Sequence, residues 1–79
     1  MNYPIDYEHY TTEEIIKIVE FLSLLEDYKE NPKHVDVEML KTKYVTYRKI
    51  LNNQSEEKTI DQAFEKQTQI SIYQTMKKL

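Results

Sequence analysis

The sequence contains no cysteine, no glycine and no tryptophan, and it has only two prolines. Without cysteine the chain has neither a disulfide nor a thiolate metal site, which fits a reducing cytoplasm. Without glycine it has no glycine-rich phosphate loop of the Walker or the dinucleotide-binding type. Its start, MNYPIDYEHY, lacks a basic segment followed by an apolar run, so we expect no signal peptide and a cytoplasmic protein.

Length and composition favour one small helical domain spanning residues 1–79. Of the 79 residues, 39 % are hydrophobic and 32 % are charged, which is typical of a soluble helical protein. A chain this short buries only about 60–65 % of its unfolded surface, so its core is limited. Residues 1–38 carry a net charge of −7 and residues 39–79 a net charge of +4. This asymmetry either draws the two halves together or recruits a basic partner to an acidic surface.

The segment Thr11–Tyr28 has the strongest helical pattern in the chain. Thr11 and Glu14 have the spacing of a capping box, in which each side chain binds the other residue's backbone N–H. The apolar residues that follow cover an arc of roughly 220°, whereas an ordinary surface helix buries little more than about 100°. This helix must therefore touch two or more other elements. Its interspersed charges exclude a membrane span.

Three further helices follow, separated by turn signals. Asn31 and Pro32 form the first turn, where we expect Asn31 to take a left-handed conformation. Asp36 is the expected N-cap of the second helix and Ser55 that of the third. The apolar stripe then changes phase by about 120° near residues 68–70, which predicts a break before a short helix capped by Ser71.

These patterns predict an all-α fold: a small three-helix bundle with an extended N-terminal strap and a short fourth C-terminal helix. The strap covers residues 1–10, and the helices cover about 12–29, 37–51, 56–67 and 72–78. We expect the core to form where the first helix meets the others, around Phe21, Leu22, Leu25 and Phe64.

Several short motifs, in order and spacing, resemble those of a known family. They are Tyr3-Pro4-Ile5-Asp6, Thr11-x-Glu13-Glu14-Ile15-Ile16, Phe21, Glu26-x-Tyr28, Ser55-Glu56-Glu57-Lys58, Phe64-Glu65-Lys66 and Ser71-Ile72-Tyr73. The chain thus resembles the YktA-like family of small uncharacterised proteins of Bacillus-type bacteria. It departs from the family pattern at Tyr10, where a tryptophan is expected, and at Gln69-Ile70, where Gly-Tyr is expected. The resemblance implies a compact cytoplasmic helical bundle and no established activity.

No residue pattern predicts catalysis, a cofactor or a metal. A nucleophile would need His9 or His34 as its base, and both lie in segments expected to be solvated. His9 with Asp6 and Glu13 lacks the spacing of a metal site. Adjacent carboxylates such as those at 13–14 and 56–57 point about 100° apart and suit helix starts better than a glycosidase cleft. We therefore expect a protein that is not an enzyme and has no small-molecule substrate.

Two binding functions remain. The first is a protein-interaction module that contacts a partner or a second copy of itself. Its expected surface contains the clustered tyrosines and the stripe of the last helix: Tyr3, Tyr7, Tyr10, Ile72, Tyr73 and Met76. Both sets have a second interpretation, because the tyrosines also suit a strap packed on the core, and the last helix can dock on its own bundle.

The alternative function is a nucleic-acid-associated regulator that uses the basic second helix. Its candidate contacts are Lys41, Lys43, Arg48 and Lys49. On a helical wheel these four side chains spread around the helix, whereas a binding stripe gathers on one face. The net charge of −3 also opposes phosphate binding. Nucleic acid is therefore the less favoured partner.

Overall fold

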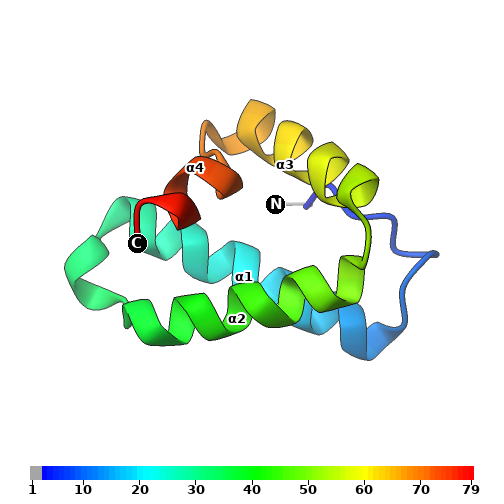
Figure 1. Ribbon diagram of the computed structural model, residues 1–79, viewed down its shortest axis with the longest axis horizontal. Helices are drawn as coiled ribbons and strands as arrows, with labels where there is room; N and C mark the ends of the chain where they lie inside the picture. Colours follow the sequence, from blue (N-terminus) through cyan, green and yellow to red (C-terminus); the bar gives the residue numbers. More distant parts are fainter. Residues whose placement is uncertain (1–2) are drawn as a thin grey trace.

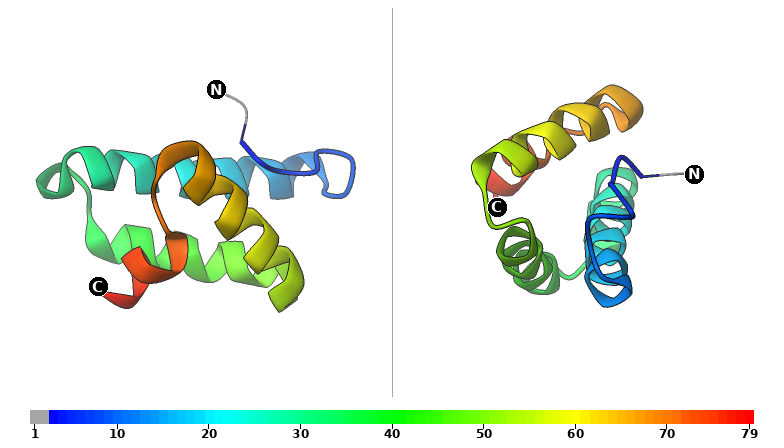
Figure 2. Two further views of the ribbon diagram at one scale, coloured as in Figure 1. Left: turned by 90° about the horizontal axis from the view of Figure 1, so that it is seen from above. Right: turned by 90° about the vertical axis from the view of Figure 1, so that its right-hand side faces the viewer.

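The computed structural model describes residues 3–79, so the first two residues of the predicted strap lie outside the described part. The elements are α1 (Thr12–Glu30), the 3-10 turn η1 (Pro32–His34), α2 (Val37–Leu51), α3 (Gln54–Thr68) and α4 (Ile72–Lys77). Residues 3–79 contain no strand, and the predicted all-α class is confirmed. Helices α1 and α2 run antiparallel, α3 crosses over them, and α4 turns back toward α2 (Figures 1 and 2).

The first two long helices begin at the caps that the sequence predicts. The Glu14 N–H donates to Thr11 Oγ1 at 3.1 Å, and the Thr11 N–H donates to Glu14 Oε1 at 2.9 Å. This closes the predicted capping box. Asp36 Oδ1 accepts from the Glu38 N–H at 2.9 Å and caps α2. Each side chain satisfies N–H groups that the first helical turn leaves without a partner.

Two predicted turn residues are wrong. Asn31 has φ −147° and is not left-handed, because η1 rather than a left-handed cap turns the chain after α1. The N-cap of α3 is Asn53 rather than Ser55, since Asn53 Oδ1 accepts from the Glu56 N–H at 2.7 Å. The cause is Asn52, whose left-handed conformation (φ 54°) ends α2 within one residue. The next residue is therefore already in position to cap α3.

The predicted break between the third and fourth helices is confirmed. Gln69 ends α3 in a left-handed conformation with φ 67°, where glycine is the residue that usually relieves the steric cost. Ile70 is buried, and Ser71 Oγ accepts from the Gln74 N–H at 3.3 Å to cap α4. Asp61 Oδ1 accepts from the Ile72 N–H at 2.9 Å, which fixes the start of α4 to the side of α3.

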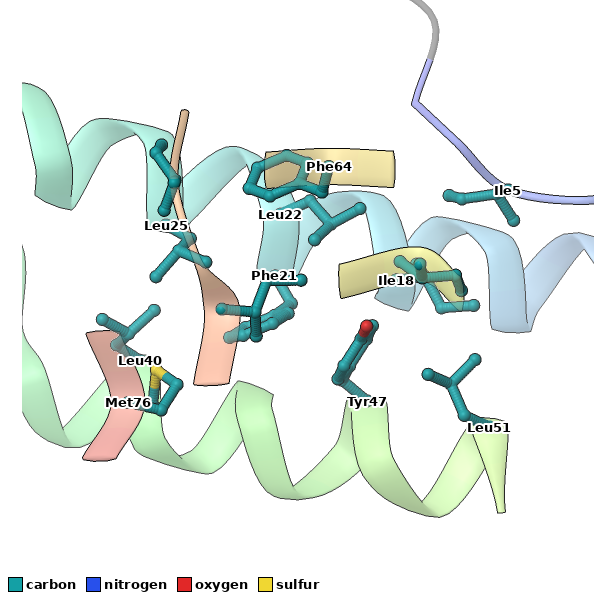
Figure 3. Close-up of a cluster of buried hydrophobic side chains, with 13 residues drawn as sticks. Ile5, Ile18, Phe21, Leu22, Leu25, Leu40, Tyr47, Leu51, Phe64 and Met76 are labelled. Atoms are coloured by element: carbon teal, nitrogen blue, oxygen red, sulfur yellow. The ribbon is translucent and has the colours of Figure 1, made fainter. Parts of the chain in front are cut away.

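The core lies inside the triangle of α1, α2 and α3 (Figure 3). The four predicted core residues Phe21, Leu22, Leu25 and Phe64 are completely buried, which confirms them. The apolar face of α1 packs along α2, and side chains of α3 and α4 complete the same buried cluster. The other buried side chains are Ile5, Ile18, Leu40, Tyr47, Leu51, Ile60, Ile70, Ile72 and Met76.

The described part of the N-terminal strap packs on the bundle. Ile5 is buried in the core, and the Tyr3 ring stacks on Phe64 at 6.4 Å between centroids. The Tyr3 hydroxyl donates to Glu26 Oε1 at 2.7 Å, and the Tyr10 hydroxyl donates to Glu56 Oε2 at 2.9 Å. The strap thus connects α1 with α3 across the side of the core that α2 leaves open.

Candidate functional site

A groove with a volume of about 340 Å³ lies between α2, α3 and the start of α4. We call it the tyrosine groove, because three tyrosine rings supply much of its wall. Its size reaches the lower end of the range for ligand and side-chain pockets, about 300–1,000 Å³. The lining residues are Tyr44, Tyr47, Arg48, Gln54, Glu57, Lys58, Asp61, Ile72 and Tyr73.

The helix geometry explains how the three tyrosines meet. Tyr44 and Tyr47 are one turn apart on α2, and their rings stack at 6.2 Å between centroids. Phe21 supports both rings from α1, at 5.5 Å from Tyr44 and 4.7 Å from Tyr47. Tyr73 comes from α4, which the hydrogen bond from Ile72 to Asp61 holds in place. Tyr73 is 56 % exposed and stands at the outer edge of the groove.

Tyr47 contains the most unusual atom of the groove. The side chain is only 2 % exposed, and Figure 3 shows it pointing from α2 into the space between the helices. Its hydroxyl has no hydrogen-bond partner among residues 3–79. Burial raises the pKa of this phenol far above its usual value, and the charges of Asp61 and Glu57 raise it further. The hydroxyl therefore stays protonated.

The charged residues of the groove are partly paired. Arg48 Nε donates to Glu57 Oε1 at 3.0 Å, and this bond raises the already high pKa of the guanidinium. The guanidinium carbon also lies 5.6 Å from the centre of the Tyr44 ring. At the edge of the groove, Lys77 Nζ lies 5.8 Å from the centre of the Tyr73 ring. Both distances fall within the range of cation–π attraction.

The six residues of the predicted partner surface do not lie on one surface. Ile72 and Met76 are buried in the protein's own core, so the stripe of the last helix docks on its own bundle. Tyr3 and Tyr10 are half-buried and hydrogen-bonded to Glu26 and Glu56. Tyr7, 47 % exposed, and Tyr73 remain accessible. Of these two, only Tyr73 lines the tyrosine groove.

The four basic residues of α2 differ in their surroundings: two contact carboxylates and two are exposed. Lys43 Nζ lies 3.9 Å from Glu20 Oε1 of α1, and Arg48 is paired with Glu57 as described above. Lys41 and Lys49 are exposed. In the described part of the chain, the Glu20–Lys43 pair is the only Lys/Arg ion pair that joins the acidic and basic halves. The His9–Glu56 contact also joins the two halves.

The two histidines have local partners. His9 Nε2 lies 2.9 Å from Glu56 Oε1, and His34 Nδ1 lies 3.2 Å from the Asn31 side-chain nitrogen. No group of three or more metal-ligating side chains occurs within residues 3–79. In the same range, no helix is both long and apolar enough to cross a membrane.

Sequence reasoning missed the tyrosine groove as a unit. The local signals were present: Tyr44 and Arg48 are four residues apart on α2, and Glu57 and Asp61 are four residues apart on α3, so each pair shares a helix edge. Nothing in the sequence shows that these two edges face each other. That juxtaposition depends on how α3 crosses α2.

Comparison with known families matches residues 1–79 to the "Uncharacterised protein family (UPF0223)". Similar relatives include a UPF0223 protein of Oceanobacillus iheyensis, 40 % identical over 76 residues that cover 96 % of this chain and 83 % of the relative. Another, from Bacillus cytotoxicus, is 36 % identical and covers 96 % of this chain and 82 % of the relative. A third, from Streptococcus uberis, is 35 % identical and covers 98 % and 80 %. No solved structure matches the chain.

Proposed function

We propose that this chain, which belongs to the uncharacterised protein family UPF0223, is a non-enzymatic cytoplasmic protein-interaction module. The predicted membership in an uncharacterised bacterial family is thereby confirmed, whereas the narrower YktA-like name stays a prediction. The proposed contact surface is the tyrosine groove together with the exposed ring of Tyr73.

The observation that carries this proposal is the residue content of the groove. Tyrosine and arginine are the side chains most enriched at the energetic centres of protein interfaces. Here Tyr44, Arg48 and Tyr73 gather around one concave surface, backed by the buried ring of Phe21. A rigid aromatic wall loses little conformational entropy on binding, which favours association.

Site-specific photo-crosslinking tests the proposal. A benzophenone side chain is placed at position 73, at the groove, or at position 16, where Ile16 is 53 % exposed on α1. Both proteins are irradiated in extract of a bacterium that contains a UPF0223 protein. We expect a discrete adduct from position 73 that unlabelled wild type competes away and unlabelled Tyr73→Glu does not. The same adducts from position 16, or no competition by wild type, would refute the proposal.

Sedimentation velocity identifies the kind of partner. A concentration-dependent dimer that Tyr73→Glu abolishes would assign the surface to a second copy of the chain. A wild-type protein that stays monomeric would exclude a second copy as the partner.

The nucleic-acid alternative has less support, because Lys43 and Arg48 contact carboxylates of the same chain. Its test is retention on DNA and RNA columns. A phosphate-binding protein elutes steeply earlier as the salt concentration rises. We expect the protein to pass through at all salt concentrations.

A further inference from the structure

The N-terminal strap, described over residues 3–10, lies on the open side of the helix bundle. Helices α1 and α3 approach each other over a short stretch at most, and α2 packs against both of them. Figure 2 shows α2 on one side of the pair and the strap on the other. Among residues 3–10 only Ile5 is buried, and it lies at the periphery of the core cluster (Figure 3). The strap therefore covers the side of the core between α1 and α3.

Side chains near the two ends of the strap attach it to carboxylates of the helices. The Tyr3 hydroxyl donates to Glu26 of α1 at 2.7 Å. The Tyr10 hydroxyl donates to Glu56 of α3 at 2.9 Å, and His9 Nε2 lies 2.9 Å from the same carboxylate. Burial and the Glu56 carboxylate raise the pKa of Tyr10 to about 12, so its hydroxyl keeps the proton that it donates.

The helices keep their own hydrogen bonds without the strap. Thr11 and Glu14, which both follow the strap, form the capping box of α1. Asn53 caps α3. Within residues 3–79, no backbone–backbone hydrogen bond joins the strap to a helix. The four strap residues at positions 6–9 are exposed. Detachment of the strap therefore breaks side-chain contacts only.

We propose that the strap is a releasable cover, which detaches as one unit while the helices stay folded and so controls access to the core between α1 and α3. Segments with few buried contacts open at a lower free energy than the whole domain unfolds. Release separates the Tyr3 ring from Phe64, and it removes the phenol donors from Glu26 and Glu56. The uncovered surface contains Phe64 and Ile60, with these two carboxylates beside them. It is separate from the tyrosine groove, so this inference goes beyond the proposed function.

Native-state thiol labelling of the free, full-length protein tests the proposal. The chain has no cysteine, so a single introduced thiol is an unambiguous reporter. Ile5→Cys places the thiol on the buried side of the strap, and Ile60→Cys places it on α3 beside the strap. Each variant is treated with a water-soluble aromatic disulfide, under conditions in which labelling is slower than reclosing. Urea denaturation of the same variant gives the equilibrium constant for global unfolding.

We expect the opening that exposes each thiol to have an equilibrium constant at least about a hundredfold larger than that of global unfolding. Its dependence on urea should be small, because release exposes little surface. Labelling of either thiol only through global unfolding, with the full urea dependence, would overturn the proposal.

A matched pair of tyrosine variants shows whether the strap moves as one unit. Tyr10→Phe removes the hydroxyl that binds Glu56, and Tyr7→Phe makes the same change at an exposed position of the strap. In the Ile5→Cys protein, we expect Tyr10→Phe to speed labelling about tenfold and Tyr7→Phe to leave it unchanged. In a Glu56→Ala background the effect of Tyr10→Phe should disappear. Unchanged labelling in Tyr10→Phe would mean that position 5 reacts without release of the Tyr10 contact, and this result would overturn a cover that moves as one unit.

Discussion

The α1–α2 hairpin and the α3–α4 arm contribute to the same core in different ways. The hairpin supplies seven buried side chains, four of them from α1 alone, and they interlock along two antiparallel helices. The arm buries Ile60, Phe64, Ile70, Ile72 and Met76, but its helices approach their neighbours over a shorter length than α1 and α2 approach each other. Hence the hairpin is stabilised by continuous packing, whereas the arm is stabilised by a few individual interactions.

This difference bears on function, because the arm forms one wall of the tyrosine groove. Regions with few buried contacts open locally at low free energy, and binding surfaces are often drawn from such regions. The hairpin wall, with Tyr44 and Tyr47 packed against Phe21, is the rigid side. The arm wall, with Asp61 and Tyr73, is the side we expect to adjust to a partner.

The largest expected effect comes from the main anchor of the arm. Phe64 is completely buried and stacks on Tyr3, so Phe64→Ala should lower the free energy of unfolding by about 3–5 kcal/mol. A domain this small has a total stability of about 5 kcal/mol, so the variant should be close to unfolded. Urea denaturation measures the change. Ile16→Ala, at an exposed position of α1, is the control and should change stability by less than about 0.5 kcal/mol. A melting temperature of Phe64→Ala within a few degrees of wild type would show that the arm is not anchored there.

A smaller effect separates the two regions directly. Ile72→Ala removes a buried side chain at the start of α4 and should cost about 2–3 kcal/mol. We expect hydrogen exchange to speed up first at the amides of α4 and the end of α3, while α1 stays protected. Gln74→Ala, at an exposed position of α4, should exchange like wild type. Uniform loss of protection in both regions would mean that the arm and the hairpin unfold as one unit.

Structural features that depend on a few neighbouring residues could be predicted from the sequence. The Thr11–Glu14 capping box, the Asp36 cap and the buried face around Phe21 were all predicted correctly, because their partners are within one or two helical turns. The Asn53 cap was missed because a nearby serine offered the same chemistry, and only the left-handed Asn52 decides between them.

Contacts between residues that are far apart in the sequence could not be predicted. Ile72 binds Asp61 across 11 residues, and Tyr10 binds Glu56 across 46. The first pair depends on how the chain turns back between α3 and α4, and the second on how the strap lies against α3; no local pattern specifies either. The tyrosine groove depends on such contacts, because its lining residues belong to three different helices, α2, α3 and α4. For the same reason Ile72 and Met76 were assigned to a partner surface, although the fold buries them.

On the rigid side of the groove, we expect a substitution to stabilise the free protein. Tyr47→Phe removes a buried hydroxyl that has no partner in the described part of the chain, so it should raise the free energy of unfolding by about 1 kcal/mol. Tyr44→Phe is the control, and it should change little because Tyr44 is only half-buried. Urea denaturation of the two variants measures the difference. A loss of stability in Tyr47→Phe would show that the hydroxyl is satisfied in the free protein, by an ordered water for example.

The smallest expected effect compares the two junctions of the arm. Asn52 and Gln69 both have positive φ, at 54° and 67°. Asparagine tolerates this conformation, whereas glutamine meets most of its steric cost. Gln69→Gly should therefore stabilise the protein by about 0.5–1 kcal/mol, after allowing for the greater freedom of glycine in the unfolded chain. Asn52→Gly should change stability by no more than a few tenths of a kcal/mol, by the same argument. Paired urea denaturation curves resolve the two variants. Equal gains at both junctions would mean that the left-handed turn after α3 carries no more strain than the one after α2.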